Sequence, residues 1–147
     1  MILKMRVWLK SFKKIQKLSS QEKLIFMKVT FNLIFLWSLL KILPFNKFLR
    51  FYKIMIYKFR GVSNHSNKLI ETSQSIKKVS RYFAFHSTCL IQALTAKLML
   101  CNIPNLSIII GVSLENGFEA HAWIEKDGDY IIGEMPVKQF TPIWNLE

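Results

Sequence analysis

The amino-acid sequence predicts an α+β fold, with apolar helices first and an antiparallel β-meander last. Two observations predict this order. Long apolar runs with few Gly or Pro residues occupy most of the chain up to residue 101, as helices require. β-branched and alternating segments follow, separated by Asn-Gly and Asp-Gly pairs that are typical of hairpin turns. The 147 residues are enough for one domain with its own hydrophobic core.

The positive charge of the chain lies almost entirely in its first part. Residues 1–61 hold 14 Lys and Arg against one acid, whereas residues 62–147 hold 7 Lys and Arg against 8 acids. We therefore divide the chain into a cationic, apolar helical region over 1–61 and a nearly neutral core over 62–147. Cationic apolar segments suit a membrane surface, an acidic peptide or nucleic acid. We expect no nucleic-acid partner, because no known nucleic-acid-binding motif occurs.

The first expected helix covers residues 1–18, which mix apolar and basic side chains at helical spacing. A basic amphipathic helix of this kind either rests on a membrane surface or packs on its own domain with a solvated basic face. The sequence leaves both alternatives open.

A long apolar helix is expected from Leu24 to Leu43. Ser19 and Glu22 form a capping-box pattern before it, and Pro44 ends it. Only the stretch 29–40 is free of charge, which is about 18 Å of helix against a hydrocarbon core of about 30 Å. We therefore expect a buried or surface-attached helix in preference to one that crosses a bilayer.

Two further helices are expected at residues 45–59 and 67–82, on either side of the turn-forming residues 61–66. The helix at 45–59 interleaves aromatic and basic residues. Such a pattern can stack on nucleic-acid bases, but it also arises when an aromatic face is core and the lysines are solvated. We favour the amphipathic helix.

One more helix and three strands complete the expected fold. Thr88 is the expected N-cap of a helix over Cys89–Cys101, which ends before Asn102 and Pro104. The strands are expected at residues 106–113, 118–126 and 129–134. Asp127-Gly128 joins the last two strands as a type I′ turn.

Cys89 is the candidate nucleophile because it begins a helix. At a helix N-terminus the backbone amides and the macrodipole favour thiolate over thiol, and the same amides can receive an oxyanion. The alternative is a buried structural cysteine, which is how we interpret Cys101. The two cysteines are about 18 Å apart along one helix, too far for a disulfide, which suits a reducing cytosol.

His121 and Glu134 are the candidate base and acid. A two-residue turn at Asp127-Gly128 sets the pairing of the strands on either side, and directly opposed residues share a face. Glu134 would then fix the tautomer of His121, whereas a slip of one residue would bring Met135 opposite instead. The expected pairs are Lys126–Asp129, Glu125–Tyr130, Trp123–Ile132 and His121–Glu134.

We expect no metal and no cofactor, because the Cys and His residues lack metal-ligand spacing and no phosphate-binding loop occurs.

Three segments together resemble a known family. They are STCLIQALTAKLML, IPNLSIIIGV and FEAHAWIEKDGDYIIGE, and they contain a Cys-Leu-x-x-Ala-Leu helix, a strand ending Gly-Val and the run Ala-His-Ala-Trp-Ile-Glu. The family is the B protein of lasso-peptide biosynthesis, in its stand-alone, transglutaminase-like leader-peptidase form. The resemblance covers about residues 20–147.

The resemblance implies a papain/transglutaminase-like core in which a nucleophile-bearing helix packs on the β-meander. It also implies a cysteine protease that removes the leader from a ribosomally made lasso precursor peptide. The expected location is the cytoplasm, with a peripheral position at the inner membrane face as the alternative. By this analogy Cys89 is the nucleophile and His121 the general base, and Glu134 stands near the place of the family's usual Asp. The implied partners are the precursor peptide, a small leader-binding protein and the lasso cyclase.

Two alternatives remain open at the level of sequence. A transglutaminase-like acyltransferase would keep the same chemistry with an amine as the acceptor in place of water. A non-catalytic cationic scaffold or membrane-associated binding protein would instead have a buried, unreactive Cys89.

Overall fold

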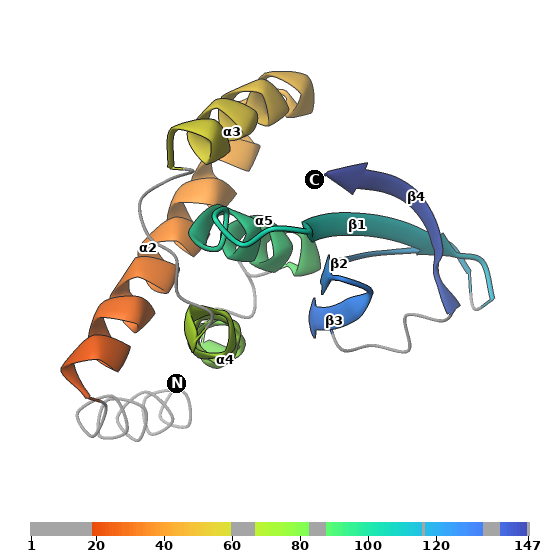
Figure 1. Ribbon diagram of the computed structural model, residues 1–147. Helices are drawn as coiled ribbons and strands as arrows, with labels where there is room; N and C mark the ends of the chain where they lie inside the picture. Colours follow the sequence, from red (N-terminus) through yellow and green to blue (C-terminus); the bar gives the residue numbers. More distant parts are fainter. Residues whose placement is uncertain (1–18, 60–66, 83–87, 116, 134–138, 147) are drawn as a thin grey trace, which may run out of the picture.

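Helices lie on one side of the molecule and a four-stranded antiparallel sheet lies on the other (Figure 1). The computed structural model describes residues 19–59, 67–82, 88–115, 117–133 and 139–146. The α+β class and the order of helices before strands are confirmed. The expected helix over residues 1–18 lies outside the described residues. The described elements are α2 (Ser20–Ile42), α3 (Phe45–Phe59), α4 (Asn67–Tyr82), α5 (Cys89–Met99), β1 (Leu106–Ser113), β2 (Glu119–Lys126), β3 (Asp129–Ile132) and β4 (Thr141–Leu146).

The capping box and the proline limit α2 as the sequence predicts, although the helix begins at Ser20, four residues before the expected Leu24, and ends one residue before Leu43. At the start, the Glu22 amide donates to Ser19 Oγ at 3.3 Å and the Ser19 amide donates to Glu22 Oε2 at 2.9 Å, which completes the capping box. At the end, Leu43 takes an extended conformation before Pro44, and the residue before a proline disfavours helix. The helix therefore begins and ends at the signals that the sequence carries.

α2 is part of the core and is also apolar enough to resemble a membrane helix. Its Val29, Leu33 and Leu36 side chains are buried in the main hydrophobic cluster. Among the described helices, α2 is the one that could cross a membrane by length and composition. A core helix of a soluble protein or a signal sequence meets the same criteria, so these properties alone do not place α2 in a bilayer.

Tyr52 joins α3 to the helix that carries Cys89. Its hydroxyl donates to the Leu94 carbonyl of α5 at 2.6 Å, and its side chain is buried. Burial raises the pKa of this hydroxyl well above the usual 10.0, and the nearby Cys101 adds to the rise. The fold therefore stabilises the neutral phenol.

We expect the free energy of unfolding to fall as the pH rises above about 10, because the unfolded chain then loses the Tyr52 proton while the folded chain keeps it. Tyr52→Phe removes this dependence. At neutral pH the variant is less stable by about 1 kcal/mol, because one hydrogen bond is lost. Urea unfolding at neutral and alkaline pH measures the difference in free energy of unfolding between the wild type and Tyr52→Phe. This difference should become smaller at alkaline pH. A difference that does not change with pH contradicts the raised pKa of Tyr52.

α5 begins at the predicted residue but ends two residues early. The Ile91 amide donates to the Thr88 side chain at 3.4 Å, which confirms Thr88 as the N-cap. The predicted end at Cys101 is wrong, because Leu100 already leaves the helical conformation. The Ile103 amide donates to the Leu100 carbonyl at 2.9 Å, so the chain turns there.

The β2–β3 hairpin matches the sequence prediction at its turn. Asp127 and Gly128 have φ values of 52° and 89°, as a type I′ turn requires. β1 pairs with β2 without interruption, with Gly111 opposite His121. Asn105 donates to Asp127 Oδ1 at 2.7 Å, which ties the start of β1 to the turn.

β4 is a fourth strand that the sequence analysis did not predict. It pairs antiparallel with β1 on the edge opposite β3, so the strand order is β3-β2-β1-β4. The predicted three-stranded meander is therefore incomplete. β1 becomes a central strand, which explains its nearly continuous apolar sequence.

The two faces of the sheet carry separate apolar clusters. On one face, Ile108, Ala122 and Ile124 belong to the main core with the helices. On the other face, Trp123 and Phe140 form a second cluster with Ile109 packed against it. Alternation along β2 therefore puts neighbouring residues on opposite sides of the sheet.

Candidate functional site

Cys89 stands at the start of α5, as the sequence predicts. It is the first helical residue after the Thr88 cap, and its side chain is half-buried against the main core cluster. The first N–H groups of a helix have no partner within the helix, so some of those near Cys89 can donate to an oxyanion. The thiol is therefore accessible in part and lies beside suitable donors.

Cys101 lies in the turn that follows α5. Its side chain is buried, and its sulfur lies 4.0 Å from Asn102 Oδ1. Within the described chain, Cys89 and Cys101 form no disulfide with each other. The position agrees with the structural role that the sequence analysis gave to Cys101.

His121 lies in β2 within an aromatic cluster. Its ring centroid is 6.1 Å from that of Trp123 and 5.4 Å from that of Phe140. Its Nε2 atom is 3.3 Å from the Gly133 carbonyl oxygen. A carbonyl only accepts, so a hydrogen bond here puts the proton on Nε2 and leaves the lone pair on Nδ1. In this tautomer Nδ1 is the atom able to act as a base.

The structure does not bring Cys89 and His121 together. Cys89 packs on the core between α5 and one face of the sheet, whereas His121 shares the opposite face with Trp123. Among the described residues, no hydrogen bond joins the two side chains. The predicted pair is thus present on the predicted elements but is not assembled.

The predicted register between β2 and β3 is wrong beyond the first two pairs. Lys126 pairs with Asp129 and Glu125 with Tyr130, as expected, but Ile132 lies opposite Ile124 and not Trp123. The shift leaves one extra residue on β3, and it places Ile132 in the main core beside Ile124. The burial of Ile132 accounts for the bulge.

This bulge removes the strand-pairing argument for Glu134, which itself lies outside the described residues. Gly133, the residue before Glu134, places its carbonyl oxygen 3.3 Å from His121 Nε2.

Two glycines make room for the aromatic cluster around His121. A Cβ on Gly111 would lie 2.8 Å from the Trp123 ring and 3.0 Å from Phe140 Cβ. A Cβ on Gly133 would lie 2.6 Å from Trp123 Cβ, and Gly133 also has a φ of 100°. Only glycine therefore fits either position without movement of the backbone or Trp123.

Glu125 and Phe140 are site neighbours that the sequence analysis missed. Glu125 Oε1 accepts from the Trp123 indole N–H at 2.7 Å, which holds the ring beside His121. The period of β2 could have identified Glu125, because residues 121, 123 and 125 share one face. Phe140 comes from the end of the chain, where no strand was predicted.

The described residues contain no group of three His, Cys, Asp or Glu side chains that could hold a metal ion.

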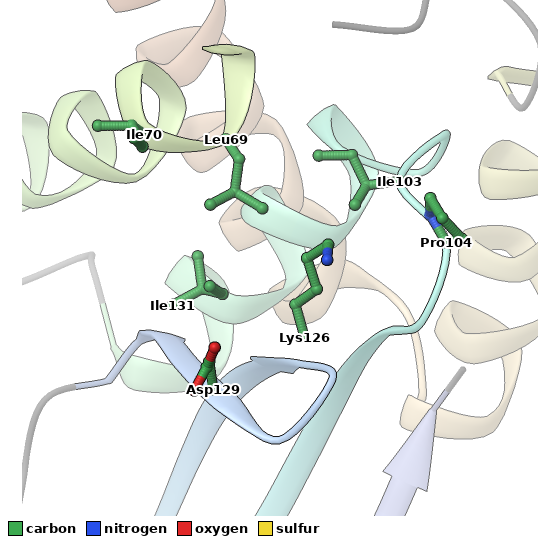
Figure 2. Close-up of a pocket in the computed structure, with 7 residues that line it drawn as sticks. All are labelled: Leu69, Ile70, Ile103, Pro104, Lys126, Asp129 and Ile131. Carbon is green, nitrogen blue, oxygen red and sulfur yellow. The ribbon is translucent and has the colours of Figure 1, made fainter. Parts of the chain in front are cut away.

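A cavity of about 390 Å³ lies between α4, the turn after α5 and the β2–β3 hairpin (Figure 2). Neither Cys89 nor His121 lines it. Its wall is mostly aliphatic, with one charged residue of each sign, and consists of Leu69, Ile70, Ile103, Pro104, Lys126, Asp129 and Ile131.

A family model decides the relationship of the chain. The model of the transglutaminase-like superfamily matches residues 59–145, more than half of the sequence. The chain belongs to the transglutaminase-like superfamily. The match spans α4, α5 and all of the sheet except the last residue of β4, and so includes both Cys89 and His121. Searches of the curated proteins and of the solved structures found no significant match.

Proposed function

We propose that the protein is a cysteine peptidase that removes the leader from a ribosomally synthesised lasso precursor peptide. The observation that carries the proposal is the superfamily match over residues 59–145, because it includes a cysteine at a helix N-terminus and a histidine on the following sheet. The superfamily includes cysteine proteases and acyltransferases. The leader-peptidase assignment rests on the three motifs around Cys89, Gly111 and His121.

In the proposed reaction, His121 Nδ1 takes the proton of the Cys89 thiol, and the sulfur attacks the carbonyl carbon of the last leader residue. The first-turn N–H groups of α5 stabilise the oxyanion, and His121 gives a proton to the leaving amine of the core peptide. The leader then remains on Cys89 as a thioester. His121 removes a proton from water, which hydrolyses the thioester and regenerates the thiol.

This chemistry requires Cys89 Sγ and His121 Nδ1 within hydrogen-bond reach of each other. The proposal therefore includes a movement that joins them when the precursor peptide or the leader-binding protein binds.

Glu134 is proposed as the group that orients His121. The support is the position of Gly133, whose carbonyl lies beside His121 Nε2, the nitrogen opposite to the proposed base. The residue that follows Gly133 carries a carboxylate and can accept from the same N–H. The remaining proposed partners are a small leader-binding protein and the lasso cyclase.

An acyltransferase is the second candidate function, because it uses the same thioester with an amine as the acceptor. One experiment separates the two. The wild-type protein, the leader-binding protein and a precursor peptide from the same gene neighbourhood are incubated with and without an excess of a small primary amine. Mass spectrometry then identifies the leader product.

We expect cleavage at one bond and a leader with a free carboxyl end, also when the amine is present. A leader that carries the amine in place of the carboxyl group supports the acyltransferase. If the precursor remains intact and Cys89 does not react with iodoacetamide, both the peptidase and the acyltransferase proposals are contradicted. That result supports a non-catalytic scaffold protein.

A further inference from the structure

α2 is apolar on two opposite sides, and only one of them faces the protein. Val29, Leu33 and Leu36 are buried in the core. The other side carries a stripe spaced three or four residues apart, which is the spacing of one helix face. The stripe consists of Leu24, Met27, Phe31 and Ile34, with exposed fractions of 57%, 66%, 68% and 46%. Among the residues that the structure describes, none buries this apolar stripe.

α3 extends the exposed face with mixed aromatic and basic side chains. Phe48 and Tyr52 hold the helix on the core, and the opposite side is in solvent. No acidic residue occurs in α3. The exposed set contains Lys47, Arg50, Phe51, Lys53, Ile54, Tyr57 and Lys58. This composition is that of a helix which lies in a membrane interface.

The two surfaces lie on neighbouring helices, and neither faces α5. α5 and α4 lie between α2 and the sheet, and α3 lies at the end of α2 (Figure 1). The buried sides of α2 and α3 both contact α5, so their exposed sides point away from it. Within residues 20–59, seven Lys and Arg accompany a single acid, Glu22. We call the exposed sides of α2 and α3 the cationic apolar face.

We propose that the cationic apolar face binds the surface of a membrane that contains anionic lipid. The apolar stripe of α2 lies at the level of the acyl chains, and Lys23, Lys28 and Lys41 on its flanks reach the headgroups. The cations of α3 add electrostatic attraction. The proposal concerns location alone and is independent of the chemistry at Cys89.

The charge of the face argues against a second copy as its occupant. A dimer through α2 would bring the cations of both copies together, with one acid per copy to offset them. The packing of α2 argues against a helix that crosses the bilayer. Its buried side contacts α4, whose Glu71, Lys78 and Arg81 side chains are exposed and would enter the hydrocarbon.

The test is flotation of the full-length protein with lipid vesicles. One set contains equal parts of phosphatidylcholine and phosphatidylglycerol, and the other contains phosphatidylcholine alone. We expect the protein to float with the anionic vesicles and to be released by high salt, because screening weakens attraction between surface charges. Cys89→Ala should bind as the wild type does.

Two matched pairs of variants assign the binding to the face. Arg50→Gln with Lys53→Gln removes two cations from α3, and Lys78→Gln with Arg81→Gln removes two exposed cations from α4. We expect a loss of roughly fivefold per α3 cation and little change for α4. Phe31→Gln should weaken binding roughly tenfold or more, whereas Tyr130→Gln, which also replaces an exposed aromatic side chain but lies on β3, should not.

Several results overturn the proposal. Equal binding to neutral and anionic vesicles would show that anionic lipid is not required. Equal losses of vesicle binding in the α3 and α4 variants would show that the cationic apolar face is not the binding surface. Protein that stays in the vesicles after an alkaline wash indicates that α2 crosses the bilayer. A dimer in light scattering that fails to float assigns the face to a second copy.

Discussion

We expect Cys89→Ala to abolish removal of the leader while the protein stays folded. The substitution deletes the sulfur that forms the thioester, so the proposed route is closed. Loss of a nucleophile in a comparable hydrolase lowers the rate by a factor on the order of 10⁶, and we expect a loss of at least about 10⁴ here. Mass spectrometry of the precursor over time measures the rate, with the leader-binding protein present in each reaction.

Cys101→Ala is the matched control for this result. The same change of residue falls on a buried thiol in the turn after α5. Cleavage should continue near the wild-type rate, with a loss of about 1 kcal/mol in stability from the deleted buried atom. If Cys89→Ala still cleaves and Cys101→Ala does not, the assignment of the nucleophile is wrong.

Gly133→Ala is expected to be the most destabilising single-methyl change in the described sheet. Its φ of 100° disfavours any side chain, at a cost of about 1–3 kcal/mol. The new Cβ also meets Trp123 Cβ at 2.6 Å, and overpacking adds about 1–3 kcal/mol. Urea unfolding measures the total, which should reach about 2–6 kcal/mol. Displacement of the Gly133 carbonyl should also lower the cleavage rate through His121.

Gly117→Ala separates the destabilisation due to backbone strain from that due to overpacking. Gly117 has a similar φ of 104°, but a Cβ there has no neighbour within 4 Å. This variant should therefore lose only the part due to backbone strain, and it should cleave the precursor normally. Equal destabilisation of the two variants is the result that contradicts the packing of Gly133 against Trp123.

Local sequence signals predicted most of the fold because the interactions behind them are local. Ser19 and Glu22 define the start of α2 through hydrogen bonds within one turn, and Asp127-Gly128 defines a hairpin through its own backbone angles. β4 and the β2–β3 bulge were missed for the opposite reason. β4 is stabilised by pairing with β1, about 29 to 38 residues earlier in the chain, and the bulge by burial of Ile132.

The candidate site was predicted in its parts but not in its assembly. The Thr88 cap placed Cys89 at a helix start, and strand alternation placed His121 beside Trp123 on one face. Neither signal tells which face of the sheet α5 covers. Packing of the helix decides that, and it selects the face with Ala122 and Ile124, opposite to His121.

The covalent intermediate is the most direct test of the proposal that Cys89 and His121 act together on a leader peptide. Wild-type protein and His121→Ala are each mixed with precursor and leader-binding protein, quenched in acid and measured by mass spectrometry of the intact protein and of its peptides. We predict a leader-mass adduct on the Cys89 peptide of the wild type, and in His121→Ala an adduct that forms at least about 10²-fold more slowly. An adduct on Cys101, or equal rates of formation in both proteins, would contradict the account.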